Sequence, residues 1–403
     1  MNKLFLFIIA FLGVSNFSFS QTNISGQSTK DANPITTAVP FLTIVPESRG
    51  GAMGDVGVAT SPDVSSIRYN IAKYPFIKND YGVSISYTPW LRNLVSDINL
   101  LDISGYIKTD EKQAIAASLT YFSLGNIQFL DEAGSFIRDY SPNEFALKAG
   151  YSRLLTKDFS LGISLAYIYS NLTGGYSNSS TEATSGNSFA ADIGLFYNKD
   201  ISIDSKDANF ALGFSVNNIG NKMSYSEGAE KDFIPTTLLL GGALTLDLDE
   251  YNSIMGSLQF SKLLVPTPPI YYNIYDINDE GDTVRTSRTY IKSGMDPNVS
   301  VVTGMIQSFY DAPGGSSEEM SELMWALGME YWYAKQFALR AGYFHESMYK
   351  GNRKFFSLGL GLKYNVFGLD FAYLIPVNGN QSPLANTLRF SISFDFAALN
   401  EKK

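Results

Sequence analysis

The chain of 403 residues contains no cysteine and only one histidine, His345. Without cysteine, disulfide bonds, thiolate metal sites and cysteine nucleophiles are excluded. One histidine cannot build a histidine metal cluster, and a catalytic triad needs a nucleophile placed beside it. We therefore expect no catalytic residue, no metal site and no cofactor, and we interpret His345 as a solvated loop residue.

Charge is scarce as well. Charged residues make up 17% of the chain and the net charge is −9. This balance argues against nucleic-acid binding, which depends on lysine and arginine neutralising phosphates. Aromatic residues reach 14%, with 25 Tyr and 28 Phe. Low charge with many aromatics is typical of a protein that has a lipid-facing band and aromatic girdles.

Long hydrophobic runs are absent after residue 20. The first 20 residues, MNKLFLFIIAFLGVSNFSFS, have a lysine, an apolar run and small residues near Ser20, the pattern of a secretory signal peptide. We expect cleavage near Ser20; the alternative is an N-terminal anchor helix, for which the run is short of the ~20 residues required. The chain is thus expected to be exported, and not to be an α-helical membrane protein.

What the chain does contain is period-two patterning. Short alternating runs such as YGVSISY, FSLGISLAYIY, FFSLGLGLKYN and TLRFSISFDF recur from Tyr81 onward. Because successive side chains of a strand point to opposite faces, each run predicts a strand with one apolar face. We count about fourteen, an even number within the range of bacterial outer-membrane barrels, and each is long enough to cross a bilayer at a tilt.

The connections alternate in length. Tight gaps such as TDEK, TKD and NVFG alternate with long ones near 124–141, 171–187, 217–235, 262–324 and 376–386; the gap 199–207 is a modest exception. Short periplasmic turns alternating with long outer loops are typical of a membrane barrel, and a soluble β-sandwich gives no reason for such a rhythm. We therefore predict an all-β membrane protein, an antiparallel up-and-down barrel of about 14 strands in the bacterial outer membrane. Phe390 and Ile392 would face lipid.

Residues 21–80 lack strand rhythm and are rich in small residues, so we interpret them as an N-terminal plug inside a barrel formed by 81–403; the alternative is a periplasmic tail. Balanced charges on lumen-facing positions predict a paired network rather than an ion filter. Arg49 and Asp55 of the plug are expected to pair with it, the alternative being solvation. The residues assigned to the plug and lumen network are Arg49, Asp55, Lys148, Asp192, Glu330, Arg340, Asp370 and Arg389.

The outer loop 262–324 is the longest connection, and long loops in compact folds are usually functional. The first part of this loop is rich in proline and tyrosine. The sequence of its second part predicts a short helix and then another helix with Ser317 as N-cap. Exposed aromatic and methionine side chains mark partner surfaces; the alternative is a lid packed on the barrel mouth. The predicted partner-binding residues are Tyr271, Tyr272, Tyr275, Met305, Phe309 and Tyr310.

Two further stretches partly match known binding motifs. DINDEGDTVRTS, residues 276–287, partly follows a calcium loop, but its twelfth position is Ser287 instead of a bidentate glutamate, so weak calcium binding is a minor alternative to a polar turn. The glycines at 50–57 lack the spacing and flanking residues of a nucleotide-binding loop. They are better explained by close packing in the lumen.

The stretch AVPFLTIVPESRGGAMGDVGVATSPDVSSIRYNIAKY resembles the N-terminal signature of the PorV/PorQ family of the Bacteroidetes type IX secretion system, and the layout is most similar to its PorV branch. The signature usually closes on Asn-Pro-Ala, whereas this chain has Asn70-Ile71-Ala72. The family is related to FadL, the long-chain fatty acid transporter. The resemblance extends over the whole chain.

The resemblance implies a non-enzymatic role. Such proteins bind the large translocon barrel in the outer membrane, collect secreted cargo carrying a C-terminal signal domain, and pass it to a surface attachment complex. The first alternative is a FadL-like transporter of hydrophobic molecules, with Ile44, Val45, Ile67 and Ile71 lining a route. A weaker alternative is a lipid hydrolase that uses His345. Expected partners are thus protein and outer-membrane lipid, and no nucleic acid.

Overall fold

A computed structural model describes most of the chain. It covers residues 32–92, 95, 97–130, 134–172, 174, 184–226, 230–277, 283–377 and 387–396, with the backbone alone at 273–277 and 283–289. The expected signal peptide, the first part of the expected plug segment and the centre of the 276–287 motif lie outside the described residues. No helix within the described ranges is long and apolar enough to cross a membrane.

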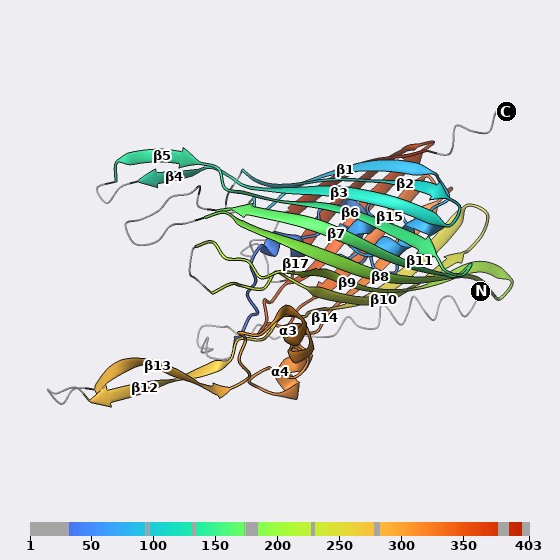
Figure 1. The fold of residues 1–403 in the computed structure, drawn as a ribbon. Helices are drawn as coiled ribbons and strands as arrows, with labels where there is room; N and C mark the ends of the chain where they lie inside the picture. The colour runs from blue at the N-terminus through green and yellow to red at the C-terminus, as the bar shows by residue number, and fades with distance from the viewer. Residues whose placement is uncertain are drawn as a thin grey trace. The chain divides into compact units, whose positions relative to one another are not determined.

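Fourteen antiparallel strands form a closed barrel (Figure 1). Their bounds are β1 Tyr81–Pro89, β2 Ile98–Asp110, β3 Gln113–Leu124, β6 Asn143–Leu154, β7 Phe159–Asn171, β8 Gly186–Ile203, β9 Lys206–Gly220, β10 Thr237–Asp247, β11 Asn252–Leu263, β14 Met324–Tyr333, β15 Phe337–His345, β16 Lys354–Tyr364, β17 Phe367–Pro376 and β18 Thr387–Phe396. β1 closes the ring against β18, with Tyr81 opposite Phe396. The predicted antiparallel barrel of about 14 strands is confirmed.

Each strand separates an apolar outer face from an inner face on which small, polar and buried apolar side chains meet the plug. On β18, Phe390 and Ile392 are exposed on the outer wall, whereas Arg389 and Ser391 are buried inside. On β7, Leu165 is 71% exposed and its neighbour Ser164 is buried. Apolar side chains that point outward all round a barrel require a lipid environment, because water would leave that surface unburied.

Short turns and long connections lie at opposite ends of the barrel. The predicted gap at 199–207 is wrong, because β8 and β9 continue to a two-residue turn at Asp204 and Ser205. Both turn residues have positive φ, 49° and 66°, as tight hairpin turns require. The end with long connections is called the outer end below, since outer-membrane barrels place their long loops outside.

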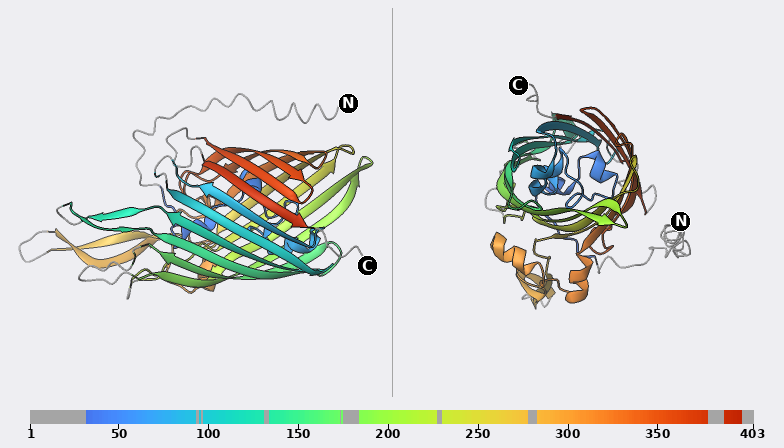
Figure 2. Two further views of the ribbon diagram at one scale, coloured as in Figure 1. Left: turned by 90° about the horizontal axis from the view of Figure 1, so that it is seen from above. Right: turned by 90° about the vertical axis from the view of Figure 1, so that its right-hand side faces the viewer.

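The barrel is filled by the N-terminal plug, of which residues 33–80 are described. It contains η2 Pro40–Thr43, α2 Ser48–Gly51, η3 Ser66–Arg68 and η4 Ile71–Phe76. Figure 2 (right) shows this blue segment enclosed by the ring of strands. The main apolar clusters join plug to wall, for example Phe41 against Phe122, and Tyr74 against Tyr106. The core of this protein is thus the interface between plug and barrel.

Two strand hairpins and two short helices are inserted at the outer end (Figure 1). They are β4 Ile127–Leu130 with β5 Phe136–Tyr140, β12 Ile270–Ile277 with β13 Thr283–Ser293, α3 Val301–Gln307 and α4 Ser316–Ser321. The sequence did not predict the hairpins. The predicted N-cap Ser317 is wrong, because α4 begins at Ser316 with Gly315 as N-cap.

Candidate functional site: the plug and the outer segment

The plug packs closely against a set of glycines on the inner wall of the barrel, called the glycine row below. At Gly213 on β9 an added Cβ would lie 2.0 Å from the carbonyl oxygen of Val58, and at Gly342 on β15 it would lie 2.0 Å from the carbonyl carbon of Met53. Plug atoms, of the backbone or of side chains, also lie within 2.8 Å of an added Cβ at Gly150, Gly162, Gly194, Gly241, Gly328 and Gly359. A side chain at Gly213 or Gly342 would collide with the plug backbone, so the wall is shaped to the path of the plug.

The wall also satisfies polar groups of the plug backbone. The side-chain Oε1 of Gln259 on β11 accepts hydrogen bonds from the N–H groups of Gly57 and Val58 at 2.9 and 3.0 Å. On β18, Ser391 accepts from the N–H of Ser48 at 2.9 Å. A buried backbone donor left without a partner costs free energy, so these bonds fix the plug in register with the wall.

Arg49 on α2 links the plug to a chain of charges on the wall. It pairs with Glu330 on β14 at 2.7 Å and with Asp63 of the plug at 2.7 Å. Glu330 also pairs with Arg340 on β15 at 2.7 Å, and Arg340 pairs with Asp370 on β17 at 2.5 Å. Each carboxylate thus faces a guanidinium, the arrangement that offsets the cost of removing charge from water.

The other network residues form two separate pairs. Asp55 of the plug pairs with Arg389 on β18 at 2.6 Å. Lys148 on β6 pairs with Asp192 on β8 at 2.5 Å and makes no ion pair with a plug residue within the described chain. The first pair fastens the plug, whereas the second braces the wall across β7.

Two titratable groups are buried inside the plug itself. Burial, reinforced by Asp63, raises the pKa of Glu47 to about 7, while its Oε1 accepts from Tyr69 and from the N–H of Gly50. Burial lowers the pKa of Lys73 to about 8, and its Nζ donates to the carbonyl of Gly57 at 2.8 Å. Both are held by hydrogen bonds inside the plug, which supports a role in its internal structure.

We define the outer segment as residues 264–323, between β11 and β14. Glu322, at the end of α4, anchors it to the barrel rim: it pairs with Lys262 on β11 at 2.5 Å and with Lys350 of the β15–β16 loop at 2.9 Å. Glu318 pairs with Lys350 at 2.5 Å. The segment is therefore fixed on the rim by buried ion pairs, none of which the sequence pattern signalled.

Asp311 is a buried carboxyl group between α3 and α4. Its Oδ2 accepts from the N–H of Thr267 at 3.1 Å, and its Oδ1 has no hydrogen-bond partner within the described residues. Burial, with Glu319 and Glu322 nearby, raises the pKa of Asp311 to about 6. The outer segment thus contains a carboxyl group that titrates just below neutral pH.

The outer segment exposes large apolar side chains. Phe309 and Tyr310, just after α3, are 52% and 60% exposed, and Tyr271 and Tyr272 on β12 are 50% and 60% exposed. Met305 is half-buried, and the side chain of Tyr275 lies outside the described residues. Six exposed apolar side chains of the outer segment are together called the outer apolar surface below: Tyr271, Tyr272, Ile306, Phe309, Tyr310 and Met320. Exposed apolar groups of this size are typical of protein contacts.

The single histidine sits at a strand end and not, as predicted, in a loop. His345 ends β15, stacks on Trp325 with ring centroids 5.1 Å apart and lies 3.3 Å from the Tyr343 hydroxyl. No serine hydroxyl is recorded as its partner in the described part of the chain. Nor do the described residues contain a group of three or more side chains able to hold a metal ion.

A closed antiparallel barrel with an apolar outer wall, a lumen filled by its own N-terminal segment and elaborated loops at one end belongs to the class of bacterial outer-membrane β-barrels. The model of a family described as "Type IX secretion system protein PorV" matches residues 27–270, more than half of the chain. The chain belongs to this PorV family and is a component of the type IX secretion system.

Solved structures are similar at low identity. The P. putida toluene transporter TodX is 12% identical, with 88% of this chain and 100% of that chain covered and a TM-score of 0.46. A Pseudomonas aeruginosa FadL homologue is 12% identical, with 91% and 100% covered and a TM-score of 0.42. The Ralstonia pickettii toluene transporter TbuX is 10% identical, with 87% and 98% covered and a TM-score of 0.43. No curated protein matches the chain.

Proposed function

We propose that this protein is a non-enzymatic component of the secretion system that binds the large translocon barrel and escorts cargo with a C-terminal signal domain to a surface attachment complex. In this proposal the outer apolar surface is the docking site. The observation that carries it is the exposure of Tyr271, Tyr272, Phe309 and Tyr310 on a segment fixed to the barrel rim by buried ion pairs. A rigid platform with aromatic anchors suits protein binding, because little is left to order on association.

The plug supports this role over a transport role. A hydrophobic molecule that crosses the lumen needs the plug to move, whereas the glycine row, the Gln259 hydrogen bonds and the Arg49 and Arg389 ion pairs all fasten it. Of the residues expected to line a hydrophobic route, Ile67 and Ile71 are buried in a plug–wall cluster. Ile44 packs against another cluster, and Val45 lines a cavity. Transport therefore stays the second candidate.

Deletion of the outer segment tests the proposal. Ser261 on β11 and Met324 on β14 are register partners, so residues 265–322 can be replaced by a short turn without parting the two strands. We expect the deletion variant to assemble as a barrel but to lose the translocon barrel and cargo in pull-downs from gently solubilised outer membranes. Equal recovery by the deletion variant would refute the site, and recovery of no secretion protein by the intact chain would refute the function.

Point variants separate docking from folding. Tyr310→Ala removes an exposed ring that makes no ring contact or hydrogen bond with a strand within the described residues, so we expect weaker recovery of partners with unchanged barrel assembly. Phe309→Ala should weaken recovery as well, but the Phe309 ring also faces the Lys262 Nζ on β11, 5.8 Å from the ring centroid, so this variant tests docking and anchoring together. Met348→Ala is the matched control, because Met348 is an exposed apolar residue, 41% accessible, on the β15–β16 loop. His345→Ala should leave secretion intact, because the proposal gives His345 no chemical role.

A further inference from the structure

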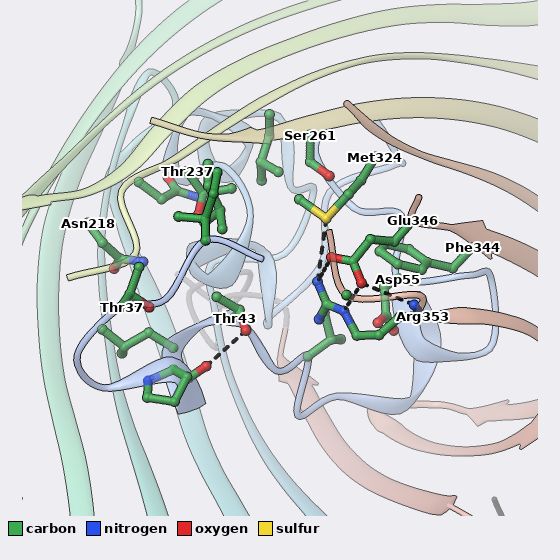
Figure 3. A pocket seen from close by; sticks show the side chains of 18 of the residues that line it. Thr37, Thr43, Asp55, Asn218, Thr237, Ser261, Met324, Phe344, Glu346 and Arg353 are labelled. Atoms are coloured by element: carbon green, nitrogen blue, oxygen red, sulfur yellow. Dashed lines mark hydrogen bonds and ion pairs between the residues drawn. The ribbon is translucent and has the colours of Figure 1, made fainter. Parts of the chain in front are cut away.

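A cavity with a volume of about 420 Å³ lies between the plug, the wall strands β9–β11 and β14–β15, and the β15–β16 loop (Figure 3). This is within the range of about 300–1,000 Å³ that is common for ligand sites. Its apolar lining comes from Leu42, Val45, Leu239, Leu263, Met324 and Phe344. Its polar lining comes from Asn217, Asn218, Thr237, Gln259 and Ser261. Amides and hydroxyls among apolar groups suit a ligand that has both polar and apolar parts.

Arg68 supplies the cavity with a cation that has no carboxylate partner within the described residues. Its Nη2 donates to the carbonyl oxygens of Leu42 and Ile44, the latter at 2.9 Å. The side chain lines the cavity and is only partly buried, and the other guanidinium N–H groups have no hydrogen-bond partner within the described residues. Burial lowers the pKa of Arg68 from its ordinary value. Three carboxylates that form no ion pair with it offset this lowering only in part: Asp102, Asp192 and Asp55.

The other charged groups around the cavity are already paired. Asp55 pairs with Arg389 at 2.6 Å, and Glu346 pairs with Arg353 at 2.9 Å. Lys350 pairs with Glu318 and Glu322 at 2.5 and 2.9 Å. Arg68 is thus the lining cation that a bound anion would complement, and a guanidinium matches a carboxylate in a bidentate geometry.

An open stretch of backbone runs along one side of the cavity. The N-terminal strap, residues 33–39, is tied at its ends, where the N–H of Asn33 donates to Tyr349 O and the N–H of Ala38 donates to Phe233 O, both at 2.9 Å. Between these points Ile35, Thr36 and Thr37 line the cavity and have no backbone hydrogen-bond partner within the described chain. An extended, unpaired backbone is the element to which a second extended chain adds.

We propose that this cavity binds a short extended peptide segment that carries a carboxylate, with the carboxylate on Arg68 and the peptide backbone along the strap. The ligand class rests on the proposed function, since a secretion component that docks proteins at its outer end meets chain ends and exposed segments there. The carboxylate belongs either to a chain terminus or to an acidic side chain. A plain fatty acid would leave the strap and the amide groups without partners.

Direct binding to the full-length protein in nanodiscs tests the inference. The probe is a dansylated tetrapeptide of alternating threonine and valine with a free C-terminal carboxylate, followed by fluorescence anisotropy. We expect saturable binding, and binding weaker by about tenfold or more for the C-terminal amide. An amide probe with glutamate at its last position decides the source: equal binding assigns a side-chain carboxylate, and weak binding assigns the terminus. No difference between acid and amide would overturn the inference.

Variants locate the site. Arg68→Gln removes the charge and leaves a shorter side chain with an amide donor, so affinity for the free acid should fall about tenfold, whereas Arg68→Lys keeps the charge and should lose less. Ser261→Phe fills the cavity from β11 and should abolish binding; the Ser261 hydroxyl has no hydrogen-bond partner within the described residues, so the substitution breaks no such bond. The matched control Ser253→Phe, near the opposite end of the same strand, should bind normally. Unchanged binding in Ser261→Phe would overturn the assignment.

The two proposals fail separately. If the peptide does not bind while pull-downs still recover the translocon barrel, the cavity assignment is wrong and the secretion role stands. If dodecanoate binds and the peptide does not, the ligand class is wrong. If the peptide binds but no secretion protein is recovered, the proposed function fails and the cavity remains a peptide site.

Discussion

Arg49 joins plug and wall through one side chain, which contacts Asp63 within the plug and Glu330 on β14. Both partners are carboxylates, and the Glu330 side chain is only 2% exposed. Removing the guanidinium leaves buried negative charge without full compensation. Breaking a buried pair in this way typically costs about 3–5 kcal/mol.

We therefore expect Arg49→Gln to loosen the plug while the barrel still assembles. Hydrogen exchange of residues 47–76 should accelerate, and ion conductance through the reconstituted barrel should rise. Lys363→Met is the control, because the ion pair of Lys363 with Asp395 is longer, 3.6 Å, and the Lys363 side chain is 46% exposed, so its loss costs about 0–1 kcal/mol. Unchanged exchange in the Arg49 variant would show that the ion pair does not hold the plug.

The raised pKa of Asp311 predicts that the stability of the outer segment depends on pH. Its pKa rises from 3.8 to about 6 because of burial and the nearby Glu319 and Glu322, so folding favours the protonated form. The stability it contributes is present below pH 4 and is lost as pH rises through about 6. Nitroxides at Ser317→Cys and Met348→Cys should report a broader distance distribution at pH 7.5 than at pH 4.5. In an Asp311→Asn background that pH dependence should disappear; its persistence would assign the titration to another group.

At the scale of elements, the glycine row predicts that the wall tolerates side chains only where the plug is absent. Gly342→Val places a Cβ where the Met53 backbone already lies, whereas Gly256 is exposed on the outer face of β11 and an added Cβ there meets nothing within 4 Å. We expect Gly342→Val to expose the plug to proteolysis in the folded barrel, and Gly256→Val to resemble the native chain. Equal protection in both variants would mean that the wall adjusts to the added side chain.

The strands were predictable because period-two patterning is local: TLRFSISFDF alone assigns Phe390 to the wall and Arg389 to the lumen. The same rule found most connections. It failed at Asp204 and Ser205, where a left-handed turn continues the strands past the expected gap. The period-two rule could not predict which charged residues pair. Contacts such as Arg49 with Glu330 join residues far apart in sequence, and no local pattern encodes them.

In the outer segment, too, local sequence patterns did not predict structure that depends on contacts between distant residues. Proline and tyrosine in VPTPPIYYNIY gave no alternation that predicts β12, and the hairpin with β13 depends on cross-strand pairing. The anchoring residues Lys262 and Lys350 were missed because they are ordinary surface types in sequence. Only the folded rim brings them to Glu322.

At the scale of the whole molecule, the question is whether the plug moves during function. Fastening by backbone packing, hydrogen bonds and ion pairs at many strands makes removal of the plug a cooperative event. A docking component has no use for such a step, whereas a transporter requires it. The absence of cysteine from the chain allows this difference to be tested with one engineered disulfide.

Ser48 of the plug and Ser391 of β18 bring their hydroxyl oxygens to 3.0 Å, so Ser48→Cys with Ser391→Cys is positioned to form a disulfide between plug and wall. We expect the oxidised double variant to support secretion as well as the reduced one, because docking uses the outer end and leaves the plug in place. Each single variant controls for loss of the serine hydrogen bonds. If oxidation blocks secretion and reduction restores it, the plug must move, and the lumen is a route instead of a filled support.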